Sequence, residues 1–407
     1  MDKAWVIATI ERIGEFGKAE RGYRRLAFGD ADWAARDYVM TLMRETGLAI
    51  RSDACGNVIG RLPGRHPEAP AVGTGSHVDT VPEGGNFDGV VGTVGGLAAV
   101  RRLASRGPLT HPLEFILFMS EESSRFGFAT MGSKAMAGLA NLAAWQKAKD
   151  PEGRDLPSVF AERGLDVAGL SAVVRRRGEL KAFVELHIEQ GPVLEREGLR
   201  IGVVEGIAAP TRLKVSVRGV AGHSGATPMG QRQDALASAA RVVLAIQAAA
   251  EREAAQGTVG TVGVLKAHPG AMNVIPGLVE MWVDIRGIDA PSIGRTVAEV
   301  HSAMVGIAEM YRTPIEAETL TADQPVPMDP TVIGAIEAAC RRLQVRYKKM
   351  PSGAGHDAMN MAHIAPAGMI FIPCRGGVSH NPDEYASPDD ILAGVDVLTE
   401  ALYDLAQ

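Results

Sequence analysis

Five histidines of this chain stand in polar, glycine-rich settings, where an imidazole could bind a metal ion or move a proton. They are His77, His187, His223, His356 and His380. A single histidine is more often a surface or hydrogen-bonded core residue than a ligand. The residues around each histidine therefore decide which of the five could do chemistry.

The first cluster is the segment GSHVDTVPEGGNFDG, which contains His77, Asp79 and Asp88. A carboxylate two residues after a histidine suits a metal ligand whose second ring nitrogen is held by an acid. Asp88 stands on a glycine-rich turn and could swing back to the same ion as His77. An ordinary Asp/Gly turn is the alternative interpretation of this segment.

The second cluster is the acidic pair Glu121 and Glu122, which directly follows the apolar run LEFILFM. Two adjacent acids at the end of a buried strand repel each other and are costly unless cations neutralise them. Neighbouring side chains point apart, so one acid could bind metal while the other faces a water molecule. The alternative is an acidic pair at a helix N-terminus, where the helix dipole favours it.

Two further clusters, ELHIEQGP and GGVSHN, contain His187 and His380. Three imidazoles and two carboxylates form a natural ligand set for two divalent ions that share one carboxylate, and Zn²⁺ or Mn²⁺ accept this mixture. Two such ions, ~3.5–4 Å apart, can polarise a carbonyl and supply hydroxide near neutral pH. Glu121 would take the proton of the water and deliver it to the leaving nitrogen. The candidate ligands are His77, Asp88, Glu122, His187 and His380.

Other catalytic motifs fit the sequence less well. The segment GHSGA around His223 lacks the last glycine of G-x-S-x-G. The sequence contains neither H-E-x-x-H nor a Walker A motif. The H-x-E at His187 resembles that of a zinc deaminase, but Cys374 is not part of the P-C-x-x-C that such a site needs.

The elements that must position these clusters are short apolar strands. Residues 71–74, 113–119 and 182–186 are such runs, and each leads into one of the clusters. Continuous apolar strands separated by helical segments predict a buried, mostly parallel α/β sheet. Open α/β sheets place their ligands at the ends of strands, where these clusters stand.

The pattern of predicted strands and helices is different between about residue 211 and about residue 325. Strands over 211–218, 260–267, 278–286 and 314–320, with helices over 234–254 and 292–310, give the order β-α-β-β-α-β. This order is typical of a ferredoxin-like α+β module. We therefore expect an α/β catalytic domain over residues 1–210 and 326–407, interrupted by an α+β domain over 211–325.

Composition limits the possible partners. The chain has 407 residues, 46% of them hydrophobic, and a formal net charge of −6. This is the balance of an ordinary globular protein, and a mildly acidic chain is a poor candidate for nucleic acid or an anionic membrane surface. The three cysteines are scattered, and the apolar runs are shorter than the ~20 residues that span a bilayer. We expect a cytoplasmic protein.

Seven motifs give the chain a family resemblance that extends over its whole length. They are GSHVDTVPEGGNFDGVVG, SEESSRFG, ELHIEQGPVLE, GHSGATPM, MNVIPG, GAGHDA and SHNPDE, in this order. The sequence resembles the M20 metallopeptidase clan, and within it the amidase/hydantoinase/carbamoylase branch. That branch contains N-carbamoyl-L-amino acid amidohydrolases, allantoate amidohydrolases and β-ureidopropionases.

The resemblance implies roles for individual residues. It implies two divalent ions per subunit (Zn²⁺ or Mn²⁺, with Co²⁺ or Ni²⁺ possible) on the five candidate ligands, with Asp88 bridging, Glu121 as general acid/base and Asp79 orienting His77. It also implies that the inserted domain is a lid and a homodimerisation module. The residues it implies for substrate contact are Gln190, His223, Asn273, Arg286 and His356, with His223 reaching the partner subunit's site.

Elementary chemistry supports two of these roles. A planar guanidinium such as that of Arg286 holds a carboxylate through two parallel hydrogen bonds, although a surface ion pair is the alternative for this arginine. His223 and Asn273 could donate hydrogen bonds to a developing oxyanion.

The expected activity is hydrolysis of the ureido C–N bond of an N-carbamoyl-L-amino acid or a related ureido acid such as allantoate. An M20 aminoacylase or dipeptidase, which cleaves N-acyl amides, is the alternative enzyme. A metal-dependent binding protein without catalysis is the alternative from another class, and the complete ligand set with Glu121 argues against it.

Overall fold

The computed structural model describes residues 2–407, and the chain divides into two compact units. The first unit comprises the chain up to Glu205, Met328–Met350 and Gly355–Gln407. The second comprises Gly206–Pro327 and Pro351–Ala354. Among the described residues, no helix is both long enough and apolar enough to cross a lipid bilayer.

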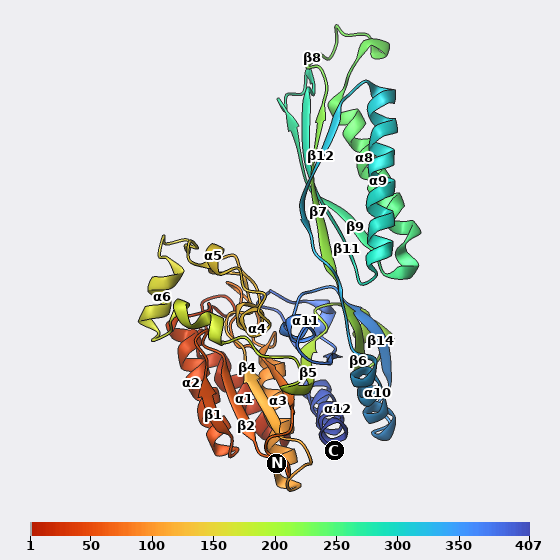
Figure 1. Ribbon diagram of the computed structural model, residues 1–407. Helices are drawn as coiled ribbons and strands as arrows, with labels where there is room; N and C mark the ends of the chain where they lie inside the picture. Colours follow the sequence, from red (N-terminus) through yellow and green to blue (C-terminus); the bar gives the residue numbers. More distant parts are fainter. Residues whose placement is uncertain (1) are drawn as a thin grey trace. The chain divides into compact units, whose positions relative to one another are not determined.

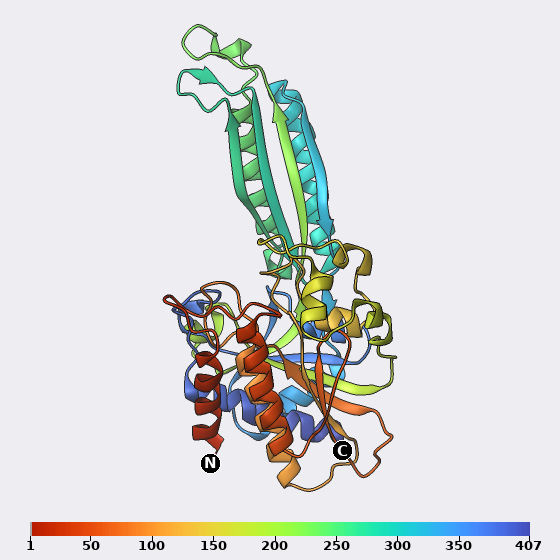
Figure 2. The same ribbon diagram turned by 90° about the vertical axis from the view of Figure 1, so that its left-hand side faces the viewer.

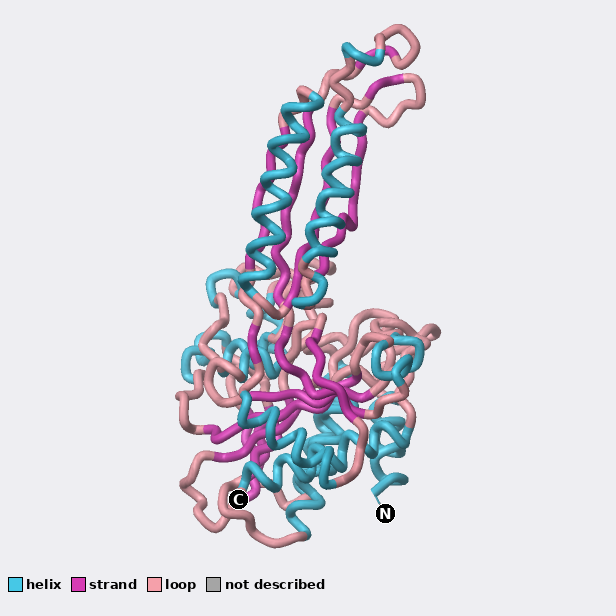
Figure 3. The backbone as a smooth tube through the Cα atoms, turned by 90° about the vertical axis from the view of Figure 1, so that its right-hand side faces the viewer, coloured by secondary structure: helices cyan, strands magenta, loops and turns pink. Residues whose placement is uncertain are grey.

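The first unit is built around a nine-stranded sheet, which crosses it between helices (Figure 3). Eight strands form the order β1-β2-β4-β3-β5-β15-β6-β13, and β14 also pairs with β6. The strands are β1 Ala49–Ser52, β2 Val58–Leu62, β3 Ala71–Ser76, β4 Leu113–Leu117, β5 Leu180–Ile188, β6 Ile201–Ile207, β13 Val326–Pro327, β14 Tyr347–Ser352 and β15 Ala367–Ile372. Of these, β13 and the last two residues of β6 and of β14 fall within the ranges of the second unit.

The sheet is mixed, and this corrects the expectation of a mostly parallel one. The central pairs β4–β3, β3–β5 and β5–β15 are parallel, whereas β1–β2, β2–β4, β15–β6 and β6–β13 are antiparallel. The prediction of a buried α/β sheet is confirmed. The parallel centre matters for function, because the strands β4, β3 and β5 end at the same edge of the sheet.

Helices of several lengths accompany this sheet (Figure 1). They are α1 Asp2–Glu15, α2 Asp30–Glu45, α3 Val90–Ser105, α4 Met131–Met136, α5 Leu142–Trp145, α6 Leu156–Glu162, η1 Val167–Ala172, α7 Val193–Glu197, α10 Pro330–Arg342, α11 Asp357–Met361, η4 Arg375–Gly377 and α12 Pro388–Ala406. Strand β5 alternates between the two sides of the sheet. Its Val184 and Leu186 enter a large apolar core with residues of α3 and α12, and the intervening Glu185 accepts a hydrogen bond from the first turn of α11.

The second unit is a four-stranded antiparallel sheet with two long helices against it (Figure 2). The strand order is β12-β7-β11-β9, and β8 and β10 form a separate two-stranded ladder. Its elements are β7 Ala209–Arg218, β8 Gly222–His223, η2 Met229–Gln231, α8 Ala235–Arg252, η3 Ala254–Gln256, β9 Val259–His268, β10 Val274–Ile275, β11 Leu278–Gly287, α9 Ala290–Tyr311 and β12 Ile315–Ala322.

The alternation of buried and more exposed residues along its strands explains why this sheet forms. Every second residue of β11 is buried, from Val279 to Gly287, and β7 alternates in the same way. The buried side chains of β7 and β11 pack with those of α8 and α9 in a core of their own. The opposite face carries charged residues, so a period of two separates core from surface in both strands.

Candidate metal centre

The five candidate ligands lie in the first unit, where they form two groups that share Asp88. His77, Asp88 and His187 make one group, and Asp88, Glu122 and His380 make the other. In each group the potential ligand atoms lie within 4.8 Å of one another. The sequence prediction that these side chains could meet is matched by this geometry.

Parallel strands bring most of these residues together. His77 follows β3, Glu122 stands shortly after β4, and His187 is the penultimate residue of β5. His380 follows η4 on the segment after β15. Since β4, β3, β5 and β15 are consecutive in the sheet, their carboxyl ends deliver four side chains to one place.

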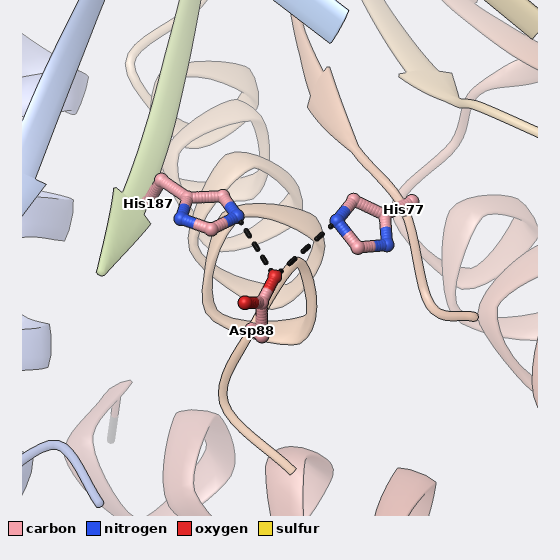
Figure 4. Close-up of side chains that lie close together, drawn as sticks. All are labelled: His77, Asp88 and His187. Carbon is pink, nitrogen blue, oxygen red and sulfur yellow. Dashed lines mark ion pairs between the residues drawn. The ribbon is translucent and has the colours of Figure 1, made fainter. Parts of the chain in front are cut away.

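Asp88 reaches this place from the loop before α3 (Figure 4). Its Oδ1 lies 3.2 Å from His187 Nε2 and 3.6 Å from His77 Nε2. Its Oδ2 lies 3.5 Å from His380 Nε2, which is in turn 3.2 Å from Glu122 Oε1. The next residue, Gly89, has φ of +66°, and a Cβ there would stand 2.4 Å from the His77 ring. Glycine is therefore needed for Asp88 to approach the histidines.

The separations fit metal ions. Two ligands at 2.0–2.2 Å from one tetrahedral ion lie roughly 3.3–3.6 Å apart, close to the 3.2, 3.5 and 3.6 Å observed around Asp88. The rings are also oriented for binding, because His77 Nδ1 lies 3.1 Å from the Asp79 carbonyl and His187 Nδ1 lies 2.9 Å from the Ile188 carbonyl. Because a carbonyl oxygen only accepts, Nδ1 carries a proton in both rings, and in the neutral, metal-binding form the lone pair of Nε2 would face Asp88.

The charges of the side chains in the site also favour the binding of metal ions. Burial would lower the pKa of His77, but Glu121, Asp79 and Asp88 together raise it well above its ordinary value. Hydrogen bonds to Asp88 and Glu122 raise the pKa of His380 to about 11. The acids of the site thus call for compensating positive charge, which divalent cations would supply. The donor set fits a pair of such ions.

Glu121 lies beside the two groups without belonging to either. Its Oε2 is 3.8 Å from His77 Nε2, and the residue is 8% exposed. Burial raises the pKa of Glu121 well above its ordinary value, and repulsion from Glu122 adds to the shift against the attraction of His77. A carboxyl that retains its proton to higher pH is suited to proton transfer.

Asp79 supports the acidic pair as well as the histidine. Its carboxylate accepts hydrogen bonds from the backbone N–H groups of Glu121, at 3.2 Å, and Glu122, at 3.0 Å. Its Oδ1 lies 3.5 Å from His77 Nδ1. The sequence indicates only the link between Asp79 and His77, because the contact with Glu121 and Glu122 joins two separate strand ends.

Two of the predicted substrate contacts also lie in this unit. Gln190 donates from Nε2 to Asp88 Oδ2 at 2.6 Å, and its Oε1 is buried without a hydrogen-bond partner among the described residues. His356 is 1% exposed, and its ring packs against those of His187 and Phe371, with centroids 4.5 and 5.7 Å away. Glu185, His187 and His356 form a third group whose potential ligand atoms lie close together.

The remaining predicted residues lie in the second unit. His223 and Asn273 are exposed neighbours, because β8 pairs with β10 and Ser224 N–H donates to the Asn273 carbonyl at 3.1 Å. Arg286 is near the end of β11, where its guanidinium donates to both oxygens of Asp284 at 2.7 Å and to the Gly353 carbonyl at 3.1 Å. The ion-pair alternative for this arginine is thus realised within its own strand.

Comparison with known proteins identifies the family. Residues 73–404 match the family described as Peptidase family M20/M25/M40. The ureidoglycolate hydrolase of Oryza sativa subsp. japonica is 43% identical over 94% of this chain and 80% of that protein. The N-carbamoyl-L-amino acid amidohydrolase of Geobacillus stearothermophilus is 41% identical over 98% of this chain and 97% of that one.

A solved structure agrees with these relatives. An amidase of the hydantoinase/carbamoylase family from Burkholderia multivorans matches with a TM-score of 0.92 and 35% identity, over 99% of this chain and 98% of that one. The resemblance drawn from the motifs is confirmed, whereas ureidoglycolate hydrolases were not among the relatives expected. The chain belongs to the peptidase family M20/M25/M40.

Proposed function

We propose that this protein is a metal-dependent amidohydrolase that cleaves the ureido C–N bond of a small ureido acid. The observation that carries the proposal is the pair of ligand groups sharing Asp88, with Glu121 beside them. Relatives named for ureido substrates, aligned over nearly the whole chain, favour this reaction over cleavage of N-acyl amides. An aminoacylase or dipeptidase is therefore the weaker alternative.

The relatives' substrates share a scaffold. N-carbamoyl-L-amino acids, ureidoglycolate and allantoate are all H₂N–CO–NH–CHR–COO⁻ and differ only in R. Water adds to the carbamoyl carbon, both C–N bonds break in turn, and the products are NH₃, CO₂ and H₂N–CHR–COO⁻. When R is a hydroxyl group, the product is a hemiaminal that releases a second ammonia as it collapses to an aldehyde. Ammonia yield thus distinguishes ureidoglycolate from a carbamoyl amino acid.

The metal centre is proposed to hold two divalent cations. His77, Asp88 and His187 would bind one, and Asp88, Glu122 and His380 the other, with Zn²⁺ or Mn²⁺ suited to this mixture of nitrogen and oxygen ligands. When bound, such a pair polarises a carbonyl group and makes water more acidic.

The chain's own residues perform the proton transfers. Glu121 accepts a proton from the attacking water and returns it to the leaving nitrogen, a role that its raised pKa and its position near the ligand groups support. Gln190 offers a buried, unpartnered Oε1 that can accept a hydrogen bond from the ureido N–H₂ group. A contact between His356 and substrate remains a prediction.

Arg286, His223 and Asn273 are proposed to bind the other end of the substrate and the developing oxyanion. Gly225 N–H donates to His223 Nδ1 at 3.1 Å, so a neutral ring carries its proton on Nε2 as a hydrogen-bond donor. Arg286 keeps N–H groups beyond those that Asp284 and Gly353 use, since a guanidinium has five. These N–H groups could meet the substrate carboxylate.

The distance between His223 and Arg286 along the second unit favours a homodimer. His223 and Asn273 lie at the Leu278 end of β11, because Gly219 N–H donates to the Gly277 carbonyl at 2.8 Å, whereas Arg286 lies at the other end. The strand places these ends about 27 Å apart, and a ureido acid is roughly 7 Å long. His223 and Arg286 of one chain therefore cannot touch the same substrate molecule. Both roles together require a second copy of the chain.

A substrate panel tests the proposed function. The protein reconstituted with Zn²⁺, Mn²⁺, Co²⁺ or Ni²⁺ is assayed for ammonia with ureidoglycolate, allantoate, N-carbamoyl-L-amino acids, β-ureidopropionate and N-acetyl amino acids. We expect ammonia from at least one ureido acid, and no such release from the Glu121→Gln variant. Cleavage of the N-acetyl compounds alone would establish the aminoacylase alternative.

A further inference from the structure

Glu384 is a buried carboxylate beside the candidate metal centre that the proposed reaction does not use. It stands four residues after His380 and is 4% exposed. A buried acid is costly unless its oxygens find hydrogen-bond donors. The donors that Glu384 has found belong to the loop that carries Asp88.

One oxygen of Glu384 holds the backbone of this loop. Oε1 accepts hydrogen bonds from the N–H of Phe87 at 2.9 Å and from the N–H of Asp88 at 3.0 Å. Two convergent N–H donors on one oxygen fix the position of the peptide between them. The Cα of the shared ligand Asp88 is thus tied to the segment that carries His380.

The other oxygen reaches the side chain of the same ligand through Ser379. Ser379 Oγ lies 2.9 Å from Glu384 Oε2 and 2.9 Å from Asp88 Oδ2. Asp88 is therefore held at its backbone by Glu384, and the single hydroxyl proton of Ser379 is shared between Glu384 Oε2 and the Asp88 oxygen that faces His380. Asp88 Oδ1 faces the other two histidines.

The loop leaves just enough space for this carboxylate. A Cβ at Gly85 would stand 2.2 Å from Glu384 Oε1, a distance that real Cβ contacts do not show. The absence of a side chain at Gly85 is what allows the carboxylate to reach the N–H groups of Phe87 and Asp88. The arrangement depends on the length of the Glu384 side chain as much as on its chemistry.

We propose that Glu384 is a positioning residue of the metal centre. It holds the loop of Asp88 so that one carboxylate oxygen faces each ligand group. The inference rests on the proposed metal centre and adds that metal affinity is set partly by a residue that binds no metal. Partners of metal ligands commonly change metal affinity 10–100-fold when they are mutated.

Two substitutions distinguish the effect of the length of the Glu384 side chain from the effect of its charge. Glu384→Gln keeps the length, and its amide oxygen can still accept from both N–H groups. Glu384→Asp keeps the charge but withdraws the oxygens by one methylene, so it cannot reach both. Zinc titrations of the metal-free full-length chain should give Glu384→Gln an affinity within about 3-fold of wild type, and Glu384→Asp a loss of at least about 10-fold.

Thermal unfolding with and without Zn²⁺ separates positioning from a general structural role. If Glu384 positions Asp88, the rise in Tm caused by zinc should shrink in Glu384→Asp, because the rise depends on affinity. A lower Tm of the metal-free protein with an unchanged zinc increment would overturn the proposal. Wild-type affinity in Glu384→Asp, or weaker binding by Glu384→Gln than by Glu384→Asp, would also overturn it. A wild-type chain that binds no zinc would refute the metal centre itself, and this inference with it.

Discussion

Asp284 binds Arg286 through two hydrogen bonds of 2.7 Å, from the Nε and Nη2 groups of the arginine to separate carboxylate oxygens. The two residues lie on the same side of β11, because they are two positions apart. The hydrogen bonds from Arg286 hold the pKa of Asp284 below its ordinary value. This pairing orients the guanidinium in advance and leaves further N–H groups for a second anion.

Arg286→Lys should raise KM for a ureido acid by about 10–100-fold with a smaller change in kcat, because an ammonium cannot reproduce the fork of a guanidinium. Steady-state kinetics of ammonia release measures both constants. Arg218→Lys is a matched control, since Arg218 is an exposed arginine of the same sheet. An unchanged KM in Arg286→Lys would remove this residue from carboxylate binding.

Glu121→Gln should lower kcat by about 10²–10⁴-fold, because the amide cannot take up or return a proton. The variant should still bind two metal ions, since Glu121 belongs to neither ligand group. Ammonia release together with metal content by elemental analysis checks both parts. Near-normal turnover with both metals bound would contradict the assignment of Glu121.

Mixing two inactive variants tests whether His223 acts across a dimer. His223→Ala should lower kcat by about 10²–10³-fold. In a heterodimer with Glu121→Gln, one site combines an intact Glu121 with the other chain's His223. Random re-association should therefore restore about one quarter of wild-type activity. No recovery in a mixture shown to exchange subunits would mean that His223 does not act in the partner's site.

The buried Asp32 should make the stability of the metal-free protein pH-dependent. Burial raises the pKa of Asp32 to about 6, with repulsion from Asp79 adding to the shift against the attraction of Arg36 and Arg25. The folded chain then binds the proton more tightly than the unfolded chain, so stability falls as pH rises from about 4 to 6.

The Asp32→Asn variant has no carboxyl group at this position, so the pH dependence caused by Asp32 should be absent. Relative to wild type, its free energy of unfolding should increase on the order of 2 kcal/mol between pH 4 and pH 7. Urea unfolding at several pH values measures the difference. Parallel pH profiles for the two proteins would contradict the raised pKa.

The positions of the candidate ligands could be predicted because each depends on local sequence and one topological rule. His77, Glu122 and His187 stand at or just beyond the ends of apolar runs, and parallel strands end at a common edge. The strands of the second unit were predictable within a few residues because β7 and β11 alternate strictly in burial.

Other features depend on contacts between distant segments. The short strands β1 and β2 carry no strong apolar pattern, and their antiparallel pairing at one edge, together with that of β6 at the other, makes the sheet mixed. Ser120, Gln190 and His380 adopt positive φ angles near +55°, which non-glycine residues rarely do. Surrounding contacts impose such conformations, and the sequence pattern does not indicate them. The sequence pattern does not indicate the role of Glu384 either, because the backbone N–H groups that donate hydrogen bonds to it lie almost 300 positions away.

Five side chains are proposed to hold two cations that share Asp88. Anomalous diffraction from crystals of the zinc-loaded protein tests this proposal most directly. We expect two peaks, one about 2.0–2.2 Å from ligand atoms of His77, Asp88 and His187, and one at that distance from Asp88, Glu122 and His380. A single peak, or a peak held by Glu185, His187 and His356 in place of the shared carboxylate, would contradict it.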